Sequence, residues 1–358
     1  MRHAAQPVIL ITGSEGLIGD AIVNWEYPNY DIASFDIARP HKRPEVQDFI
    51  DCDLTSDESV NRALETLRER HGNKIASVVH LAAYYDFSGK PSPLYRKLTV
   101  EGTRRLLHGL QSFEVDQFVF SSTHIVMKPA ENDEMITEAS PVGAEWDYPK
   151  SKLATEKIIR EERGAIPAVI LRIGGVYNED GHTVPIAQQI ARIYEKRFES
   201  YFFPGNPSAA QAFVHLDDLV DLVHKVIESR HQLGPYEVLL VAEPDQVSYD
   251  DLQDIIGKEI HGAEWPTIQI PKLVAKAGAW TLDKLSGDDD SFIKPWMIDR
   301  ADDHYPVSSE RARELLGWVP KHRLRDTIPG MVRRLRENPQ RWYELNGMSV
   351  PEEMKAKK

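Results

Sequence analysis

A tyrosine and a lysine four positions apart form the most suggestive pair of reactive side chains in the sequence. Tyr148 and Lys152 open a strongly helical segment, and this spacing places both on one helix face. A tyrosine with its ordinary pKa of about 10 is a poor base at neutral pH, but a neighbouring ammonium lowers that pKa by stabilising the phenolate. The pair could therefore exchange a proton with a substrate hydroxyl. An exposed helix pair without function is the alternative.

Hydroxyl side chains precede this pair and give it a context. The apolar run at residues 117–120 leads into Ser121, Ser122 and Thr123. Ligands of an α/β sheet bind beyond the carboxyl ends of its strands, so the Thr123 hydroxyl could bond a substrate oxygen that is being oxidised or reduced. Turn chemistry at a strand end is the alternative for this triplet. The neighbouring His124 could line the same site or fill the turn.

Three glycines spaced three residues apart follow the first apolar run of the chain. Gly13 permits a tight turn, Gly16 lets the backbone approach a pyrophosphate, and Gly19 lets the following helix pack closely on the strand. The helix N-terminus adds unpaired N–H groups and a partial positive charge. We expect a dinucleotide on this loop, held by Gly13, Ser14, Glu15, Gly16, Leu17, Ile18 and Gly19.

An acidic residue ends the second apolar run. Asp36 follows Gly19 by 17 residues, where a carboxylate accepts hydrogen bonds from the adenosine ribose and repels a 2′-phosphate. This favours NAD over NADP as the cofactor. A basic cluster just downstream could instead hold a phosphate; its members are Arg39, His41, Lys42 and Arg43.

The third strand ends at Asp53 and Leu54, where a carboxylate or backbone group could meet the adenine edge. Alternatively, Asp53 or Thr55 simply caps the helix that starts near Asp57. Cys52 is the single cysteine of the chain, which excludes an intramolecular disulfide. We interpret it as a small buried apolar residue.

The elements that must position these residues follow an alternating pattern. Short apolar runs, typical of parallel strands buried on both faces, occupy residues 8–11, 32–35, 75–79, 117–120 and 168–173. Helical segments lie between them at residues 16–25, 56–69, 93–110 and 150–162. The order predicts an α/β fold with a doubly wound, Rossmann-type parallel sheet. Beyond residue 174, prolines break the chain into shorter pieces, which predicts a smaller C-terminal α/β substrate domain.

Composition limits the classes of function. The 358 residues include 43 basic and 56 acidic side chains, a formal charge of −13, which argues against a nucleic-acid partner. No apolar stretch approaches the roughly 20 residues of a membrane span, and residues 268–282 are predicted to form an amphipathic helix. No His-Glu-x-x-His or Cys/His spacing predicts a metal site. We expect a cytoplasmic protein.

These residues together resemble the extended short-chain dehydrogenase/reductases and, more narrowly, the NAD-dependent epimerase/dehydratase family. The resemblance covers about residues 7–330. It rests on the glycine segment from Thr12 to Gly19, Asp36, Asp53-Leu54, His80-Leu81-Ala82-Ala83, Ser121-Ser122-Thr123, Tyr148 with Lys152, residues 213–219 and residues 315–320.

The resemblance implies roles for several residues. Tyr148 would be the acid/base, Lys152 would bind the nicotinamide ribose and lower the tyrosine pKa, and Thr123 would contact the substrate hydroxyl. The cofactor would also meet Leu81, Ala82 and Ala83. The implied domains are residues 1–175 with about 210–242 for NAD, about 176–209 and 243–330 for substrate, and 331–358 as a terminal helix and tail. A homodimer through the helices at residues 93–110 and 150–162 is implied as well.

Three departures from the family pattern bear on the substrate. Thr99 stands where members often have asparagine, and Gly175 stands where sugar-nucleotide enzymes place another asparagine. Gln211 replaces an arginine that pairs with a nucleotide phosphate, and glutamine lacks its charged fork. The chain is thus predicted to be an NAD-dependent oxidoreductase or epimerase acting by hydride transfer at a secondary alcohol or keto carbon, of a sugar-like substrate.

Two alternatives remain open from the sequence. One is a dehydrogenase or reductase of the 3β-hydroxysteroid or flavonoid type, NAD(P)-dependent, which needs no diphosphate contacts. Its substrate could meet an aromatic wall of Tyr84, Tyr85 and Phe87, and the candidate substrate residues are Tyr85, His124 and Gly175. The other is a non-catalytic dinucleotide-binding regulator, against which the joint presence of Tyr148, Lys152 and Thr123 speaks.

Overall fold

The computed structural model describes residues 6–25, 27–37, 48–86, 89–131, 134–276 and 295–354. Its centre is a parallel sheet with strand order β12-β7-β6-β4-β1-β2-β3, and β5 (Glu114–Val115) adds a short pairing to β4. The strands are β1 (Val8–Thr12), β2 (Asp31–Asp36), β3 (Asp48–Asp51), β4 (Lys74–His80), β6 (Phe118–Thr123), β7 (Ala168–Ile173) and β12 (Tyr236–Val241). The order reverses between β1 and β4, so the predicted doubly wound sheet is confirmed.

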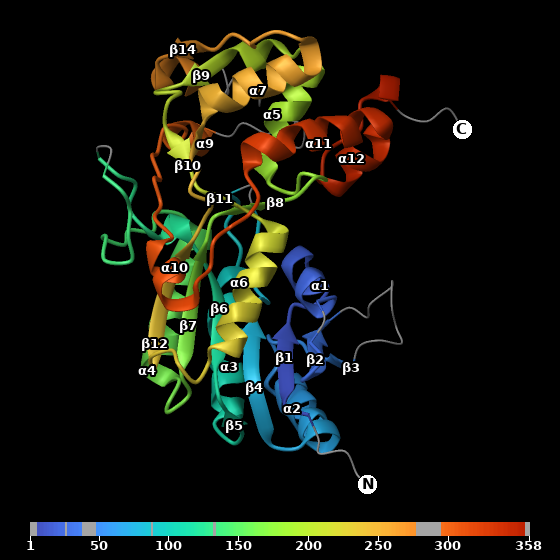
Figure 1. Ribbon diagram of the computed structural model, residues 1–358, viewed down its shortest axis with the longest axis vertical. Helices are drawn as coiled ribbons and strands as arrows, with labels where there is room; N and C mark the ends of the chain where they lie inside the picture. The colour runs from blue at the N-terminus through green and yellow to red at the C-terminus, as the bar shows by residue number, and fades with distance from the viewer. Residues whose placement is uncertain are drawn as a thin grey trace.

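Helices cover both faces of this sheet (Figure 1). Helices α2 (Asp57–His71), α3 (Glu101–Leu110) and α4 (Asp147–Glu162) pack on one face, and α1 (Leu17–Val23) and α6 (Leu216–Glu228) on the other. Successive residues of β1 point to opposite faces, so Leu10 joins the first apolar core and Ile11 the second. This explains why β1 is apolar throughout, with no alternation.

The predicted helix over residues 93–110 is divided. Residues Tyr95–Val100 form a π-helical turn, η1, and α3 begins only at Glu101. Within this turn the Thr99 carbonyl accepts the hydroxyl of Thr103 (2.6 Å), and the Thr155 hydroxyl lies 3.3 Å from it while donating more closely to the Ser151 carbonyl (2.8 Å). Side-chain donors of this kind compete with the regular helical pattern, and hydropathy periodicity does not register them.

The later part of the chain lies beyond the carboxyl ends of the strands, at the top of Figure 1. Helices α5 (Val184–Tyr194), α7 (Tyr249–His261), α11 (Leu324–Glu337) and α12 (Pro339–Leu345) share a separate apolar core. Three small sheets accompany them, β8 (Gly175–Tyr177) with β11 (Phe213–His215), β9 (Phe202–Pro204) with β14 (Ile268–Ile270), and β10 (Ala210–Gln211) with β13 (Val247–Ser248). Helix α9 (Pro295–Asp299) follows, whereas α10 (Glu310–Leu316) packs against β12 and α6 of the central sheet (Figure 1).

The predicted amphipathic helix over residues 268–282 is wrong at its start. Ile268–Ile270 form β14, which pairs in parallel with β9. Alternating side chains in a three-residue strand are easily mistaken for part of a helical pattern, and Pro271 then separates the strand from the helical residues 272–276. Residues 277–282, like the acidic run at residues 288–290, lie outside the described residues. No helix in the described ranges is long and apolar enough to cross a membrane.

Asp218 ties the two halves of the chain together. Its carboxylate accepts the backbone N–H groups of Lys321 (3.0 Å) and His322 (2.8 Å), and its carbonyl accepts the indole N–H of Trp318 (2.9 Å). Trp318 is 1% exposed and packs in the core beneath α6, as an apolar anchor should. His215 caps α6 by accepting the Asp217 N–H at its Nδ1 (3.2 Å).

A buried chain of hydrogen bonds runs through His80 and joins β1, β4 and α3. The Thr103 hydroxyl donates to the Thr99 carbonyl, so it must accept from His80 Nε2 (2.8 Å). The His80 Nδ1 lone pair then accepts from the Thr12 hydroxyl (2.7 Å), which in turn accepts the Ala82 N–H (3.3 Å). Burial lowers the pKa of His80 to about 3, so the imidazole stays neutral and the direction of every bond is defined.

Replacing Thr103 with valine should break this chain while preserving the shape of the side chain. It leaves the buried His80 Nε2–H without an acceptor, and we expect the free energy of unfolding to fall by about 2–3 kcal/mol. Urea unfolding at neutral pH measures it. The matched control is Thr66→Val, whose hydroxyl bonds the Arg62 carbonyl on the surface of α2, and whose effect should stay within about 0.5 kcal/mol. Equal losses in both variants would contradict the role of the chain.

Candidate active site

The glycine loop after β1 is built so that only one of its three glycines has room for a Cβ atom. A Cβ on Gly13, whose φ is +71°, would lie 2.8 Å from the Ala82 nitrogen, and a Cβ on Gly19 would overlap the Gly13 carbonyl. A Cβ on Gly16 would meet the Gly13 oxygen at 3.4 Å, an ordinary contact. No side chain caps α1. The residues Gly13, Ser14, Glu15, Gly16, Leu17, Ile18 and Gly19 therefore form a backbone cradle that fits a diphosphate.

Asp36 holds the glycine loop from the end of β2. Its Oδ2 accepts the Glu15 N–H (3.0 Å) and its Oδ1 accepts the Ile37 N–H (2.7 Å). The carboxylate is half-buried beside the loop, where a ribose would have to lie if the diphosphate bound the loop. The basic residues Arg39, His41, Lys42 and Arg43 lie outside the described residues.

The residues after β3 form a turn that the Asp53 side chain stabilises. The Asp53 carboxylate accepts from both the N–H and the hydroxyl of Thr55 (2.8 Å each), and Ser56 is the residue that caps α2. The expectation that Asp53 or Thr55 caps this helix is therefore wrong. Leu54 is buried and touches α3, where a Cβ on Gly102 would meet it at 3.1 Å. Cys52 is buried as predicted, and burial raises the pKa of its thiol to about 12.

The segment after β4 closes one side of the cradle. Leu81 N–H donates to the Thr12 carbonyl (3.1 Å), and Ala82 packs against Gly13. Tyr84 N–H then donates to the Thr99 hydroxyl (3.0 Å). The residues Leu81, Ala82 and Ala83 thus lie beside the glycine loop, and Thr99 serves a backbone-anchoring role in this protein.

Three side chains from β6 and α4 meet at the carboxyl edge of the sheet. The Tyr148 hydroxyl hydrogen-bonds Thr123, the last residue of β6. The Lys152 ammonium donates to the Ser121 carbonyl (2.7 Å) and lies 5.9 Å from the centre of the Tyr148 ring. One turn of α4 therefore places the predicted pair together, and β6 supplies a hydroxyl and a carbonyl to orient it.

The charge state of this group differs from the sequence-based expectation. Burial lowers the pKa of Lys152 to about 7, against the opposing charge of Glu156, and burial raises the pKa of Tyr148 above its usual range. Desolvation therefore outweighs the attraction between ammonium and phenolate that the spacing suggested. In the protein without cofactor, Tyr148 is a neutral hydroxyl beside a lysine that is poised to lose its proton.

A buried ion pair stands behind the reactive group. Arg172 Nη2 donates to Glu156 (2.7 Å), and the Ser122 hydroxyl donates to the same carboxylate (2.5 Å). Glu156 lies one turn beyond Lys152 on α4. Sequence reasoning missed this pair, although an acidic residue four positions after a helical lysine in a buried segment was an available signal.

The candidate substrate residues surround Tyr148 unevenly. The Tyr85 ring stands edge-on to Tyr148 at 5.0 Å, and the Trp146 ring lies 5.6 Å from it. Tyr84 instead packs edge-on against Tyr95 (4.8 Å). Phe87, the third member of the proposed aromatic wall, lies outside the described residues. Two aromatic rings thus flank the Tyr148 side chain.

His124 has a defined protonation state. Its Nδ1 donates to the Ile173 carbonyl (3.1 Å), its ring stands edge-on to Tyr305, and burial lowers its pKa to about 4. Its Nε2 is a buried atom with no hydrogen-bond partner among the described residues. His124 is therefore a neutral acceptor packed directly beside Thr123.

Two of the departures from the family pattern have structural causes. A Cβ on Gly175 would lie 2.7 Å from the Phe213 ring, so an asparagine there requires that ring to move. The Gln211 amide donates to the Asp303 carbonyl (2.6 Å). Both positions are thus committed to contacts within the chain.

In the described ranges, one group of residues has metal-ligand spacing: His215, Asp217 and His322. The two imidazole rings stack at 4.0 Å and 19°. Because the rings are nearly parallel, their in-plane lone pairs point in the same direction and do not converge on one ion. In addition, His215 Nδ1 already accepts the Asp217 N–H. The group therefore has the geometry of a helix cap.

A protein-family comparison matches residues 9–242 to the NAD dependent epimerase/dehydratase family. The chain belongs to this family. It is thus an NAD-dependent enzyme of the epimerase/dehydratase type, which transfers hydride between the cofactor and a secondary alcohol or keto carbon. The predicted family and cofactor are confirmed, and the glycine cradle provides the fitting site for NAD.

Characterised relatives differ in what they act on. The chain is 25% identical to a UDP-glucose 4-epimerase from Azospirillum brasilense, over 93% of this chain and 92% of that one. It is 27% identical to a decarboxylating sterol-4-alpha-carboxylate 3-dehydrogenase from Candida albicans, over 56% and 59%. The fold matches the UDP-glucose 4-epimerase of Thermus thermophilus in complex with NAD, with a TM-score of 0.68, 21% identity and coverage of 92% and 99%.

The variants Gly16→Ala and Gly19→Ala should have different effects: the first should weaken NAD binding, and the second should reduce the stability of the fold. Gly16→Ala places a methyl group in ordinary contact with the Gly13 oxygen (3.4 Å), so the free energy of unfolding should change by at most about 1 kcal/mol, while NAD affinity falls at least about tenfold. Gly19→Ala forces the methyl group into the Gly13 carbonyl and should cost more than about 2 kcal/mol of stability. Calorimetric NAD titration and urea unfolding measure the two effects. Unchanged NAD affinity in Gly16→Ala would place the diphosphate elsewhere.

Lys152→Met should stabilise the cofactor-free protein at neutral pH. The pKa of Lys152 is about 7 in the folded state and about 10.4 in the unfolded state, so the unfolded chain binds more protons between these values. Stability of the native protein therefore rises with pH across this window, and the advantage of the variant shrinks from about pH 7 to about pH 9.5. Urea unfolding across this range measures it, with exposed Lys150→Met as control. An advantage that does not change with pH would contradict the lowered pKa.

Proposed function

We propose that Tyr148 exchanges the proton of the substrate hydroxyl, with Thr123 and Lys152 as its partners. The observation that carries the proposal is the convergence of these three residues at the carboxyl edge of the sheet. NAD, when bound, would supply the acceptor and donor of the hydride for the substrate carbon. Thr123 orients the reacting oxygen through its hydrogen bond with Tyr148, and Lys152 contacts the nicotinamide ribose.

Lys152 takes part in the proton transfer through its own lowered pKa. A lysine that titrates near neutral pH can bind a proton with little change in free energy. Its ammonium then stabilises a developing phenolate on Tyr148. Ser121 holds its nitrogen by the backbone carbonyl, and Glu156 balances its charge from one turn away. The cofactor contacts are Asp36, Asp53, Leu54 and the backbone of residues 13–19 and 81–83.

The substrate is a small molecule with a secondary alcohol, and a sugar-like compound is the first candidate. The relative of similar length from Azospirillum brasilense, a UDP-glucose 4-epimerase, supports it. In such a reaction the hydride returns to the opposite face of the keto carbon and no reduced cofactor accumulates. His124, a neutral acceptor beside Thr123, and the Tyr85 ring beside Tyr148 are the substrate contacts.

A sterol-like or flavonoid-like alcohol is the second candidate, favoured by two observations. The Phe213 ring fills the space of a family asparagine at Gly175, and Gln211 is bound to Asp303 where an arginine would pair with phosphate. Such an alcohol would lie against Tyr85 and Trp146, which flank Tyr148. This reaction releases reduced cofactor at each turnover.

A substrate panel distinguishes the two candidates. The purified chain with NAD is offered UDP-glucose, with sugar product followed by chromatography, and a secondary sterol alcohol, with NADH followed by absorbance. Conversion of UDP-glucose without net NADH supports the epimerase, and NADH formed in proportion to sterol ketone supports the dehydrogenase. If neither compound is converted, and no other sugar nucleotide or secondary alcohol in a wider panel is converted either, both candidate functions are contradicted.

The assembly and location proposed for the chain follow from the family resemblance. Residues 1–175 with about 210–242 bind NAD, about 176–209 with 243–330 bind substrate, and 331–358 complete the C-terminus. Two copies pair through α3 and α4 in the cytoplasm. The molar mass in solution tests the pairing, and a mass of one chain at all concentrations would contradict it.

Tyr148→Phe should abolish turnover and leave NAD binding intact. The variant removes one hydroxyl that bonds Thr123, and loss of a positioned acid/base lowers rates by at least about 100-fold. Turnover is measured on whichever compound the panel identifies, and NAD affinity by calorimetry. The control is Tyr84→Phe, whose ring packs on Tyr95 away from the reactive group. Full activity in Tyr148→Phe would overturn the assignment.

A further inference from the structure

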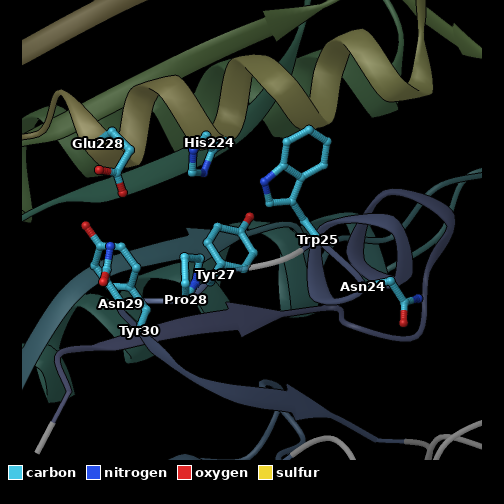
Figure 2. Close-up of a pocket in the computed structure, with 8 residues that line it drawn as sticks. All are labelled: Asn24, Trp25, Tyr27, Pro28, Asn29, Tyr30, His224 and Glu228. Carbon is cyan, nitrogen blue, oxygen red and sulfur yellow. The ribbon is translucent and has the colours of Figure 1, made fainter.

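A second pocket lies outside the active site, between α6 and the loop that joins α1 to β2 (Figure 2). It has a volume of about 640 Å³, which is in the size range of small-molecule sites. The loop contributes Trp25, Tyr27 and Tyr30 to its lining, and α6 contributes His224 and Glu228. Because β2 starts at Asp31, directly after this loop, the pocket opens at the amino-terminal edge of the sheet, away from the edge that carries Tyr148.

Aromatic rings supply most of its wall. The His224 ring lies 5.7 Å from both the Trp25 and the Tyr27 rings, and Tyr30 stands edge-on to Tyr27 at 6.4 Å. Trp25 remains 36% exposed, an unusual position for a tryptophan that serves only the core. The negative faces of such rings attract an organic cation.

Glu228 adds a negative charge at the opposite side of the pocket. It lies one turn after His224 on α6, and Figure 2 shows its carboxylate directed at the loop. Across the described part of the chain it forms no ion pair, and its hydrogen bond goes to the neutral Tyr30. The Arg230 guanidinium donates to the same Tyr30 hydroxyl (2.8 Å), but its ion pair is with Asp116 (3.3 Å). The Glu228 charge is thus available to a ligand.

Two polar atoms of the pocket are left without partners. The hydroxyl of Tyr27, a residue that is 8% exposed, and Nδ1 of His224 are buried atoms with no hydrogen-bond partner among the described residues. A buried polar atom left unpaired costs about 1–3 kcal/mol. Both atoms, like the Glu228 carboxylate, can accept a hydrogen bond from an N–H donor.

We propose that this pocket binds the protonated primary amine of a small molecule. An alkylammonium has N–H donors for the Glu228 carboxylate and for His224 Nδ1, which lies one turn away on the same helix, and its alkyl chain would lie against the Tyr27 and Trp25 rings. An anion would meet the Glu228 charge, and a neutral ligand would leave that charge unpaired. Binding requires a small shift of the rings that shield Tyr27 and His224, and Trp25, being partly exposed, has room to move.

The test uses n-butylammonium chloride as the probe and the full chain. The indole N–H signal of Trp25, assigned by its absence in Trp25→Phe, is followed by NMR during titration. We expect a saturable shift with n-butylammonium, and no saturable shift with n-butanol over the same concentrations. A tetramethylammonium arm, which has the charge but no N–H group, should bind at least about fivefold more weakly.

Variants identify the residues responsible. Glu228→Gln should weaken n-butylammonium binding at least about fivefold, and Tyr27→Phe should weaken it by a smaller factor with the fold intact by circular dichroism. Glu65→Gln, an exposed carboxylate on α2, is the matched control and should change nothing. No saturable shift, equal binding of n-butanol, or no effect of Glu228→Gln would each overturn the proposal. The active site is not part of this pocket, so NAD binding should be unaffected throughout.

Discussion

The chain of hydrogen bonds through His80 is the constraint on which the arrangement of the site depends. One neutral imidazole connects the end of β1 to α3, and both its nitrogens have defined roles. Through Thr12 and Ala82 it sets the distance between the glycine loop and the segment after β4. Through Thr103 and Thr99 it reaches the π-helical turn on which Tyr84 is anchored. A cofactor on the loop would thus lie on a backbone whose position is fixed by the buried hydrogen bonds through His80.

Three consecutive residues at the end of β6 each form a hydrogen bond with a different side chain. Ser121 offers a carbonyl to Lys152, Ser122 a hydroxyl to Glu156, and Thr123 a hydroxyl to Tyr148. All three partners lie on α4, so the register between this helix and strand decides whether the reactive group exists at all. The buried pair of Glu156 and Arg172 contributes to that register, since a slipped helix would leave a charge unpaired inside the protein.

Much of this could be predicted from spacing alone, since strand runs, the three glycines and the Tyr148–Lys152 interval are local patterns. Three features could not. The turn at Thr99 depends on hydroxyls from α3 and α4, the lowered pKa of Lys152 depends on how deeply α4 is buried, and the role of Gly175 depends on the ring of Phe213. Each is set by residues distant in sequence, which periodicity cannot report.

The attachment of Trp318 and Asp218 has a consequence for synthesis of the chain. The apolar layer beneath α6 includes Trp318, which follows the last strand of the central sheet, β12, by more than 70 residues. While the ribosome is still adding those residues, the emerging sheet lacks part of its cover on that face. Residues 9–242, the extent of the family match, therefore lack Ala312 and Trp318 of this apolar cluster until the C-terminal residues are added, and transiently exposed apolar surface of this kind is prone to aggregation.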